Sequence, residues 1–181
     1  VTYVKENADT LTMANAGIGA ASHLCGMLFQ QALDVSLVTV PYQGTGPAMT
    51  DLLGGQVDMM CDQTTNTSEQ IRGGTIKGYA VTSPARLSNL HAVPTAAEAG
   101  LPGFQIGIWH AIYAPKGTPK EIVDRLNAAT RKVLEDPAVK KRIEDTGSFV
   151  IANTPEQFAQ QIKDELAVYK QVVTKQKLTL Q

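Results

Sequence analysis

The stretch Thr10-Leu-Thr-Met-Ala14-Asn-Ala-Gly17-Ile-Gly19-Ala-Ala-Ser22-His23 decides how the rest of this sequence folds. Its first five residues are apolar or β-branched and predict a strand. From Ala20 to about Leu33, apolar side chains recur every three to four residues and predict a helix. A strand that passes through glycines into a helix directs unpaired backbone N–H groups outward, and the helix dipole favours an anion there. The glycines therefore form either an anion site or only a tight turn.

The length and composition of the chain limit its domain number and the kinds of partner that it can have. The chain has 181 residues, 43% of them hydrophobic and 18% charged, enough for one domain or two small lobes with hydrophobic cores. A net charge of -1 without a block of Lys and Arg argues against a nucleic-acid partner. No apolar run approaches the roughly 20 residues that a membrane span needs.

The two cysteines, Cys25 and Cys61, are too few for a disulfide framework. Each lies among apolar residues, which favours buried free thiols over a bridge between them. No cluster of His and Cys has metal-ligand spacing, so we expect neither a metal nor a cofactor.

The first eighty residues repeat a strand, a loop and a helix. After the opening strand at residues 10–14, strands are predicted at residues 36–40, 57–61 and 76–82. Short connections between strands and helices predict an α/β fold, a mostly parallel sheet flanked by helices.

Ligands of such sheets bind beyond the carboxyl ends of the strands. The predicted loops at that edge are residues 15–19, 42–47 and 62–66, which are rich in Gly, Thr, Asn and Gln. Three polar loops that meet at one edge favour a binding site there.

The C-terminal part differs in character from the rest. Residues 104–113 form an extended run, and helices are predicted after capping boxes at Thr118-Pro-Lys-Glu121 and Thr154-Pro-Glu-Gln157, and after Asp136-Pro. With one further short strand expected at residues 148–152, this part cannot complete a sheet alone. We therefore expect two segments: residues 1–106 as one α/β lobe, and residues 107–181 as a hinge strand and the returning part of another lobe.

Several motifs resemble the periplasmic receptors of tripartite tricarboxylate transporters, the Bug family. They are Asn15-Ala-Gly-Ile-Gly-Ala-Ala-Ser-His23, Val40-Pro-Tyr-Gln-Gly-Thr-Gly-Pro followed by Leu-Leu-Gly-Gly-Gln-Val-Asp58, Val93-Pro-Thr-Ala-Ala-Glu-Ala-Gly-Leu-Pro-Gly103, and Trp109 with Tyr113-Ala-Pro-Lys-Gly-Thr-Pro119. The similarity runs over essentially the whole chain. Residues 60–67, Met-Cys-Asp-Gln-Thr-Thr-Asn-Thr, are similar to the branch proposed to bind acidic amino acids such as aspartate.

The resemblance implies a periplasmic-binding-protein-like fold of type II, the Venus flytrap. A dicarboxylate or an acidic amino acid such as aspartate or glutamate would lie between two lobes, held by backbone N–H groups, hydroxyls and waters, and integral membrane permease subunits would be partners. The chain starts at Val1 without a signal peptide or the family's first-lobe loop. It is thus expected to hold the second lobe and the C-terminal return of an incomplete first lobe, which could self-associate.

The three loops and the resemblance together predict a set of ligand-binding residues. Several of these residues have two possible roles. Ser22 and His23 either contact the anion or only cap and pack. Thr45 is expected as the N-cap of its helix, with its N–H still at the cleft. Asp62 is expected to cap the following helix, or it binds a ligand's amino group. The complete set is Asn15, Ala16, Gly17, Gly19, Ala20, Ser22, His23, Tyr42, Gly44, Thr45, Gly46, Asp62 and Gln63.

Two other functions are weighed against a receptor. An enzyme that uses a nucleotide or phosphate would need the third glycine of the dinucleotide fingerprint, where Ser22 stands. No nucleophile–base pair or split pair of carboxylates is apparent, so we expect no catalytic residue and no enzyme. A receptor-like sensor domain is the remaining alternative.

Overall fold

The computed structural model describes residues 1–175, without the side chains of residues 168, 171–173 and 175. The chain divides into two compact units, Val1–Ile108 and Trp109–Gln181. The last six residues of the expected segment 107–181 lie outside the described residues. Within the described part, no helix combines the length and the apolar character that crossing a bilayer requires.

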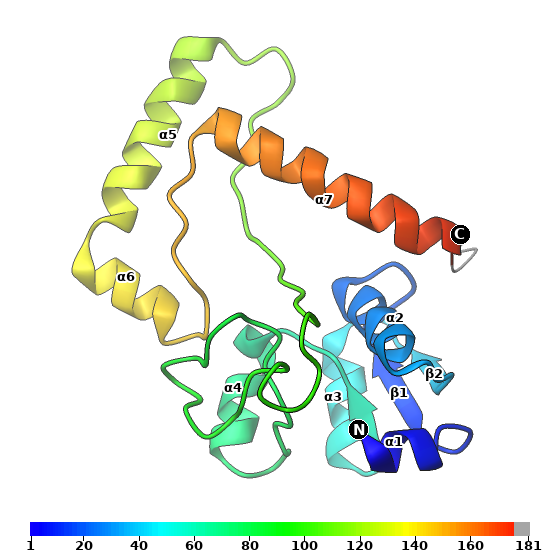
Figure 1. Ribbon diagram of the computed structural model, residues 1–181. Helices are drawn as coiled ribbons and strands as arrows, with labels where there is room; N and C mark the ends of the chain where they lie inside the picture. Colours follow the sequence, from blue (N-terminus) through cyan, green and yellow to red (C-terminus); the bar gives the residue numbers. More distant parts are fainter. Residues whose placement is uncertain (176–181) are drawn as a thin grey trace. The chain divides into compact units, whose positions relative to one another are not determined.

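Unit 1 is built around a three-stranded parallel sheet in the order β2-β1-β3. The strands are β1 (Thr12–Asn15), β2 (Val38–Pro41) and β3 (Met59–Met60), and α1 (Thr2–Glu6) precedes them. A helix follows each strand in turn: α2 (Ala21–Leu33), α3 (Thr45–Leu53) and α4 (Thr64–Arg72) (Figure 1). The predicted α/β fold with a parallel sheet and flanking helices is confirmed.

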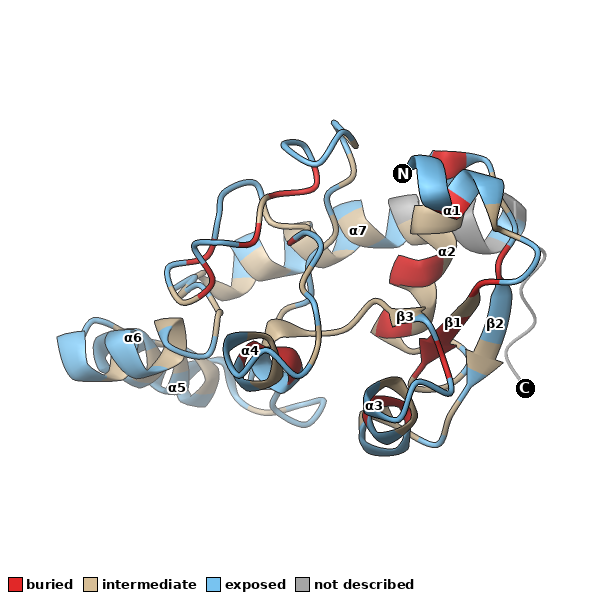
Figure 2. Ribbon diagram, turned by 90° about the horizontal axis from the view of Figure 1, so that it is seen from below, coloured by how far each residue is buried: buried red, intermediate tan, exposed pale blue. Residues whose placement is uncertain are grey.

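Helices cover both faces of the central strand β1, and its alternating side chains pack against α2 on one face and α3 on the other. Met13 faces α2, where an added Cβ on Gly26 would lie 3.2 Å from the Met13 sulfur. Ala14 is fully buried on the other face with Ala48 of α3 and Val57. Figure 2 shows β1 as a buried strand between the two helices. The small residues allow both helices to pack closely on the strand.

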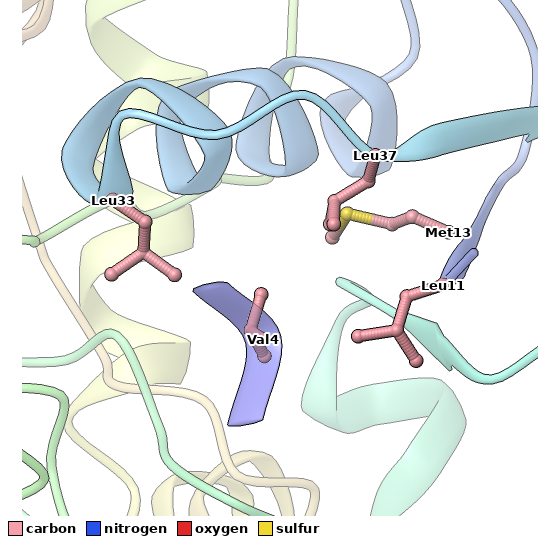
Figure 3. Packing of buried hydrophobic residues seen from close by; sticks show 5 residues of the cluster. All are labelled: Val4, Leu11, Met13, Leu33 and Leu37. Carbon is pink, nitrogen blue, oxygen red and sulfur yellow. The ribbon is translucent and has the colours of Figure 1, made fainter. Parts of the chain in front are cut away.

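A hydrophobic cluster closes the amino end of the sheet. Val4 of α1 and Leu11 and Met13 around the start of β1 pack with Leu33 and Leu37 under α2 (Figure 3). Burial of each such side chain contributes roughly 1.5–3 kcal/mol. The cluster therefore fixes α1 and α2 against the sheet at the end opposite the predicted site.

The amino ends of β1 and β3 are tied by Thr12 and Asp58. The carboxylate Oδ2 of Asp58 accepts hydrogen bonds from the Thr12 backbone N–H at 2.8 Å and from its hydroxyl at 2.7 Å. The Asp58 N–H in turn donates to the Thr12 hydroxyl oxygen at 2.9 Å. These donors lower the pKa of Asp58. The two strands are thereby held in register although β3 is short.

The fourth strand predicted at residues 76–82 is wrong. Only Val81 makes an isolated parallel bridge, with Thr95. Val81 belongs to a separate apolar cluster with Leu87, Leu90 and Val93, against which Ile71 of α4 packs. The segment fails to join the sheet because its apolar residues pack on this loop cluster.

A salt bridge between Arg86 and Glu98 closes the loop that lies between these two residues. The Arg86 guanidinium Nε lies 2.9 Å from Glu98 Oε2, which also accepts the Thr95 backbone N–H at 2.7 Å. These interactions, with the Arg86 hydrogen bond as the largest, lower the pKa of Glu98 to about 2. The charged pair therefore holds the two ends of the loop together.

The helices in the described part of unit 2 are α5 (Lys120–Leu134), α6 (Pro137–Glu144) and α7 (Pro155–Lys175). The expected strand at residues 148–152 is wrong, since that segment pairs with no strand in the described part of the chain. The predicted start of a helix after Asp136-Pro is confirmed by α6, and Asp136 caps it: its Oδ1 accepts the Ala138 N–H at 2.8 Å. The capping box of α7 is confirmed as well, through hydrogen bonds between Thr154 and Gln157.

The capping box expected for α5 does not form. Pro119 occupies the N-cap position, and the Thr118 hydroxyl donates to the Pro115 carbonyl at 2.8 Å instead. Elsewhere in unit 2, Trp109 packs edge-on against Phe158 at 4.7 Å between ring centroids. None of the residues of α5 and α6 is buried, so the apolar side chains on these helices have no deep core around them.

Candidate functional site

The carboxyl edge of the unit 1 sheet brings three helix N-termini together. The strands are parallel, and α2, α3 and α4 each begin within a few residues of the end of the preceding strand. The first N–H groups of a helix have no intrahelical acceptor, and the dipole places partial positive charge there. This edge of the sheet therefore favours an anion.

Loop 1, residues 16–20, connects β1 to α2 through two glycines with positive φ. Gly17 has φ 124° and Gly19 has φ 81°, conformations that other residues rarely adopt. The N–H groups of Ala16 and Gly17 are taken up within the loop, by Ser22 Oγ at 2.9 Å and Asn15 Oδ1 at 3.0 Å. The N–H of Ala20 donates to the Gly17 carbonyl at 3.1 Å. Loop 1 is thus internally bonded, and the donors it presents are those of the first turn of α2.

The side chains of Ser22 and His23 hold this loop. Ser22 is buried, and its hydroxyl is the acceptor for Ala16. His23 Nδ1 accepts the Gly19 N–H at 3.2 Å, so the neutral imidazole carries its proton on Nε2. Burial lowers the pKa of His23, which favours that neutral form. The capping and packing roles considered for both residues are therefore present, and each keeps a further hydrogen that it can donate.

Asn15 has a buried donor without a partner. The residue is 2% exposed; its Oδ1 accepts from Gly17, and its Nδ2 has no hydrogen bond within the described residues. Asn15 lines a small cavity of about 10 Å³ with Ser22, His23 and Thr39, enough for about one water molecule. A buried unpaired donor costs about 1–3 kcal/mol. An acceptor placed beside Asn15 would recover that cost.

Loop 2, residues 42–44, leads from β2 into α3 and touches loop 1. The Tyr42 N–H donates to the Asn15 carbonyl at 2.9 Å, and a Cβ on Gly17 would lie 3.3 Å from the Tyr42 carbonyl oxygen. The Tyr42 hydroxyl donates to Asp51 Oδ2 at 2.7 Å, an interaction that raises the pKa of Tyr42. Tyr42 is therefore held on the α3 side of the loop.

The expectation that Thr45 is the N-cap of α3 is wrong. Gly44, with φ 112°, occupies the cap position, and Thr45 and Gly46 are the first two helical residues. The glycine turn starts the helix one residue earlier than the sequence suggested. It leaves the Thr45 side chain to form a hydrogen bond with Asp62, which joins loop 2 to loop 3.

Loop 3, residues 61–63, leads from β3 into α4. Gln63 is the N-cap of α4, so the cap expected at Asp62 is displaced by one residue. The Asp62 carboxylate still serves the helix start, because it accepts from the Gln63 N–H and from Asn66 Nδ2 at 3.3 Å. Burial, the largest influence, raises the pKa of Asp62, while its hydrogen bonds lower it. An ionised Asp62 opposes a nearby anion and suits an amino group.

Cys25 and Cys61 form a disulfide, so the expectation of free thiols is wrong. Their Cα atoms lie 6.0 Å apart, within the usual range for a bridge. The bridge exists because β3 pairs with β1, with Met59 opposite Met13, which puts Cys61 on the face covered by α2. Sequence alone does not give this strand order. Among the described residues, no group of His, Cys, Asp and Glu is arranged to hold a metal ion.

Comparison with known proteins gives consistent matches. Residues 1–178 match the family model described as tripartite tricarboxylate transporter family receptor. The chain is 45% identical over 177 residues to the "UPF0065 protein in the TAR-I ttuE-ttuC' intergenic region" of Agrobacterium vitis, covering 96% of this chain and 51% of that protein. The chain thus spans about half the length of this curated relative.

Solved structures are similar as well. The periplasmic binding protein BugD is 49% identical with a TM-score of 0.87, over 99% of this chain and 61% of that one. MatC (Rpa3494) from Rhodopseudomonas palustris with bound malate is 41% identical with a TM-score of 0.81, over 95% and 60% of the two chains. R. palustris Rpa4515 with adipate is 29% identical with a TM-score of 0.88, over 96% and 58%.

Proposed function

We propose, from the premise that this chain belongs to the tripartite tricarboxylate transporter receptor family of periplasmic solute-binding proteins, that unit 1 forms one wall of a site for a small carboxylate. The family and the similar structures are binding proteins and not enzymes. The ligand class is a dicarboxylate or an acidic amino acid such as aspartate or glutamate. The receptor would present this ligand to integral membrane permease subunits.

The observation that carries the proposal is the meeting of three helix N-termini at one edge of the sheet. Loop 1 touches loop 2 through Tyr42 and Asn15, and loop 2 is joined to loop 3 through Thr45 and Asp62. First-turn N–H groups of α2 and α3 replace the hydration of a carboxylate there. Charge-assisted hydrogen bonds of this kind contribute roughly 1.5–3 kcal/mol each.

The charge of the site residues favours recognition by backbone groups and hydroxyls. No Lys or Arg is present among them, so the ligand's negative charge is met by helix dipoles and neutral donors. The unused donor of Asn15 and the hydroxyl of Ser22 add to these. The proposed ligand-binding residues are Asn15, Ala16, Gly17, Gly19, Ala20, Ser22, His23, Tyr42, Gly44, Thr45, Gly46, Asp62 and Gln63.

The choice of dicarboxylates as the first ligands to test follows from the similar structures. MatC is solved with malate and Rpa4515 with adipate. Acidic amino acids are the second choice, because Asp62 is half-buried at the start of α4 and can accept from a ligand's ammonium group. Malate and aspartate differ at the position of that group, so a comparison of their affinities reports on the role of Asp62.

Isothermal titration calorimetry of the full-length protein tests the proposal. Malate, adipate, aspartate and glutamate are titrated separately, with the diamide of malate as an uncharged control. We expect one-to-one binding of at least one acid and no heat from the diamide. Absence of binding by every acid, or equal binding of the diamide, would refute a carboxylate site.

Self-association is proposed for unit 2. Ile122, Leu126 and Val133 of α5 are at least half exposed, and an exposed apolar stripe favours contact with a second copy. Light scattering after size-exclusion chromatography of the 181-residue chain should give at least a dimer. Because association follows mass action, a monomer at every concentration measured, including the highest that the protein reaches, would contradict it.

A further inference from the structure

The disulfide between Cys25 and Cys61 lies within the candidate site. Cys25 is on α2, two residues after His23, and is buried. Cys61 directly follows β3 and directly precedes Asp62. The bridge therefore joins the helix that presents its first turn to the ligand with the loop that carries Asp62.

Few other interactions hold loop 3 in place. The strand β3 has only two residues, Met59 and Met60, and both pair with β1. The following helix α4 packs through Ile71 on the loop cluster around Val81, away from the sheet. Besides the hydrogen bond between Thr45 and Asp62 and the packing of Cys61 on the cluster around Met13, the disulfide is the covalent link from loop 3 to the rest of the site.

We propose that the Cys25–Cys61 disulfide is a positioning element that fixes loop 3 against α2, so that ligand affinity depends on its oxidised state. The inference rests on the proposed function, because the affinity concerned is that for a small carboxylate. When the bridge is intact, the first turn of α2 and the start of α4 keep a fixed separation. When it is broken, loop 3 is held only by non-covalent contacts, namely its hydrogen bonds and the packing of Cys61 on the cluster around Met13.

Reduction by a dithiol is the reaction that breaks the bridge. The dithiol gives two electrons and two protons to the bond between the two Sγ atoms, which separates into two thiols, and the dithiol becomes a cyclic disulfide. The half-buried Cys61 is the accessible partner for attack, because Cys25 is only 4% exposed. Dithiothreitol is thus a suitable probe.

A matched control lies at the other end of β3, where Asp58 bonds to Thr12 of β1. Thr12 and Asp58 tie β1 to β3 at the amino ends, whereas Cys25 and Cys61 tie α2 to β3 at the carboxyl end. An Asp58→Asn variant weakens the unit far from the ligand. A Cys25→Ser/Cys61→Ser variant weakens it beside the ligand.

The experiment compares oxidised, reduced and variant forms of the full-length protein. Free thiols are counted with a chromogenic disulfide reagent, malate affinity is measured by calorimetry, and amide hydrogen exchange is followed by mass spectrometry. We expect reduction and the double cysteine variant to weaken malate binding at least tenfold. We also expect them to speed amide exchange at Asp62 and Gln63 at least tenfold. Asp58→Asn should lower the melting temperature and leave the affinity within twofold.

Three results would overturn the inference. One is unchanged affinity and unchanged exchange after both thiols are counted as free. Another is a loss of affinity in Asp58→Asn equal to that in the cysteine variant, which would indicate a general effect of stability. The third is unchanged exchange at loop 3 in a protein that binds no acid. In that protein faster exchange would still support the positioning role, although the proposed function had failed.

Discussion

Substitution of Gly17 tests whether loop 1 shapes the ligand site. Gly17 has φ 124°, and a Cβ there would lie 3.3 Å from the Tyr42 carbonyl oxygen. Holding a valine in such a conformation costs about 1–3 kcal/mol. At about 2–4 °C per kcal/mol for a chain of this size, Gly17→Val should lower the melting temperature by about 2–12 °C. Relief of the strain would shift loop 1 and the first turn of α2, so we expect at least tenfold weaker malate binding, about 1.4 kcal/mol.

The control for this experiment is Gly55→Val. Gly55 also has a positive φ, 70°, but it lies after α3 and has no atom within 4 Å of an added Cβ. Its substitution should lower the melting temperature to a similar extent without altering the affinity. Calorimetry and thermal unfolding are measured on both variants. If Gly17→Val binds malate as the unaltered protein does, loop 1 is only a turn and does not shape the ligand site.

Three further predictions concern charged groups. Asp62→Asn should weaken aspartate binding about tenfold and leave malate binding unchanged or tighter, since the carboxylate accepts from an ammonium group; calorimetry showing equal changes for both ligands would contradict this. Burial lowers the pKa of His23, so the stability that its neutral form contributes is fully present above about pH 6.5 and is lost as the pH falls through the pKa of the folded state. His23→Gln should therefore make the melting temperature less dependent on pH between pH 7.5 and 5. An unchanged dependence on pH would disprove this role of His23. Glu98 has a pKa of about 2, so the stability that its ionised form contributes is present above pH 4.5 and is lost as the pH falls towards 2. Glu98→Gln should remove this contribution to the loss of stability in acid. An acid unfolding profile identical to that of the unaltered protein would refute a stabilising interaction with Arg86.

Local signals in the sequence predicted the elements that position the site. The turn at Gly17 and Gly19, the strand before it and the helix after it depend on residues close together in the chain. The same is true of the caps at Asp136 and Thr154. Because parallel strands end at one edge, the order of strand, loop and helix was sufficient to place the three loops together.

Features that depend on contacts distant in sequence were not predictable in this way. The disulfide needs β3 beside β1, and an apolar neighbourhood alone suggested free thiols at Cys25 and Cys61. Residues 76–82 have the composition of a strand, but Val81 packs with Leu87 and Val93 instead of joining the sheet. The link between Thr45 and Asp62 likewise depends on Gly44 starting α3, which composition did not distinguish from a threonine cap.

A crystal structure of the full-length protein with malate would show whether the carboxylate is bound at the carboxyl edge of the unit 1 sheet. We predict that a ligand carboxylate lies within 3.2 Å, about the limit of an N–H···O hydrogen bond, of first-turn N–H groups of α2 and α3. Asn15 Nδ2 should then bond to the ligand or to a water that contacts it. Malate bound away from the carboxyl edge of the sheet, or held by Lys and Arg side chains of unit 1, would contradict recognition by helix N-termini at this edge.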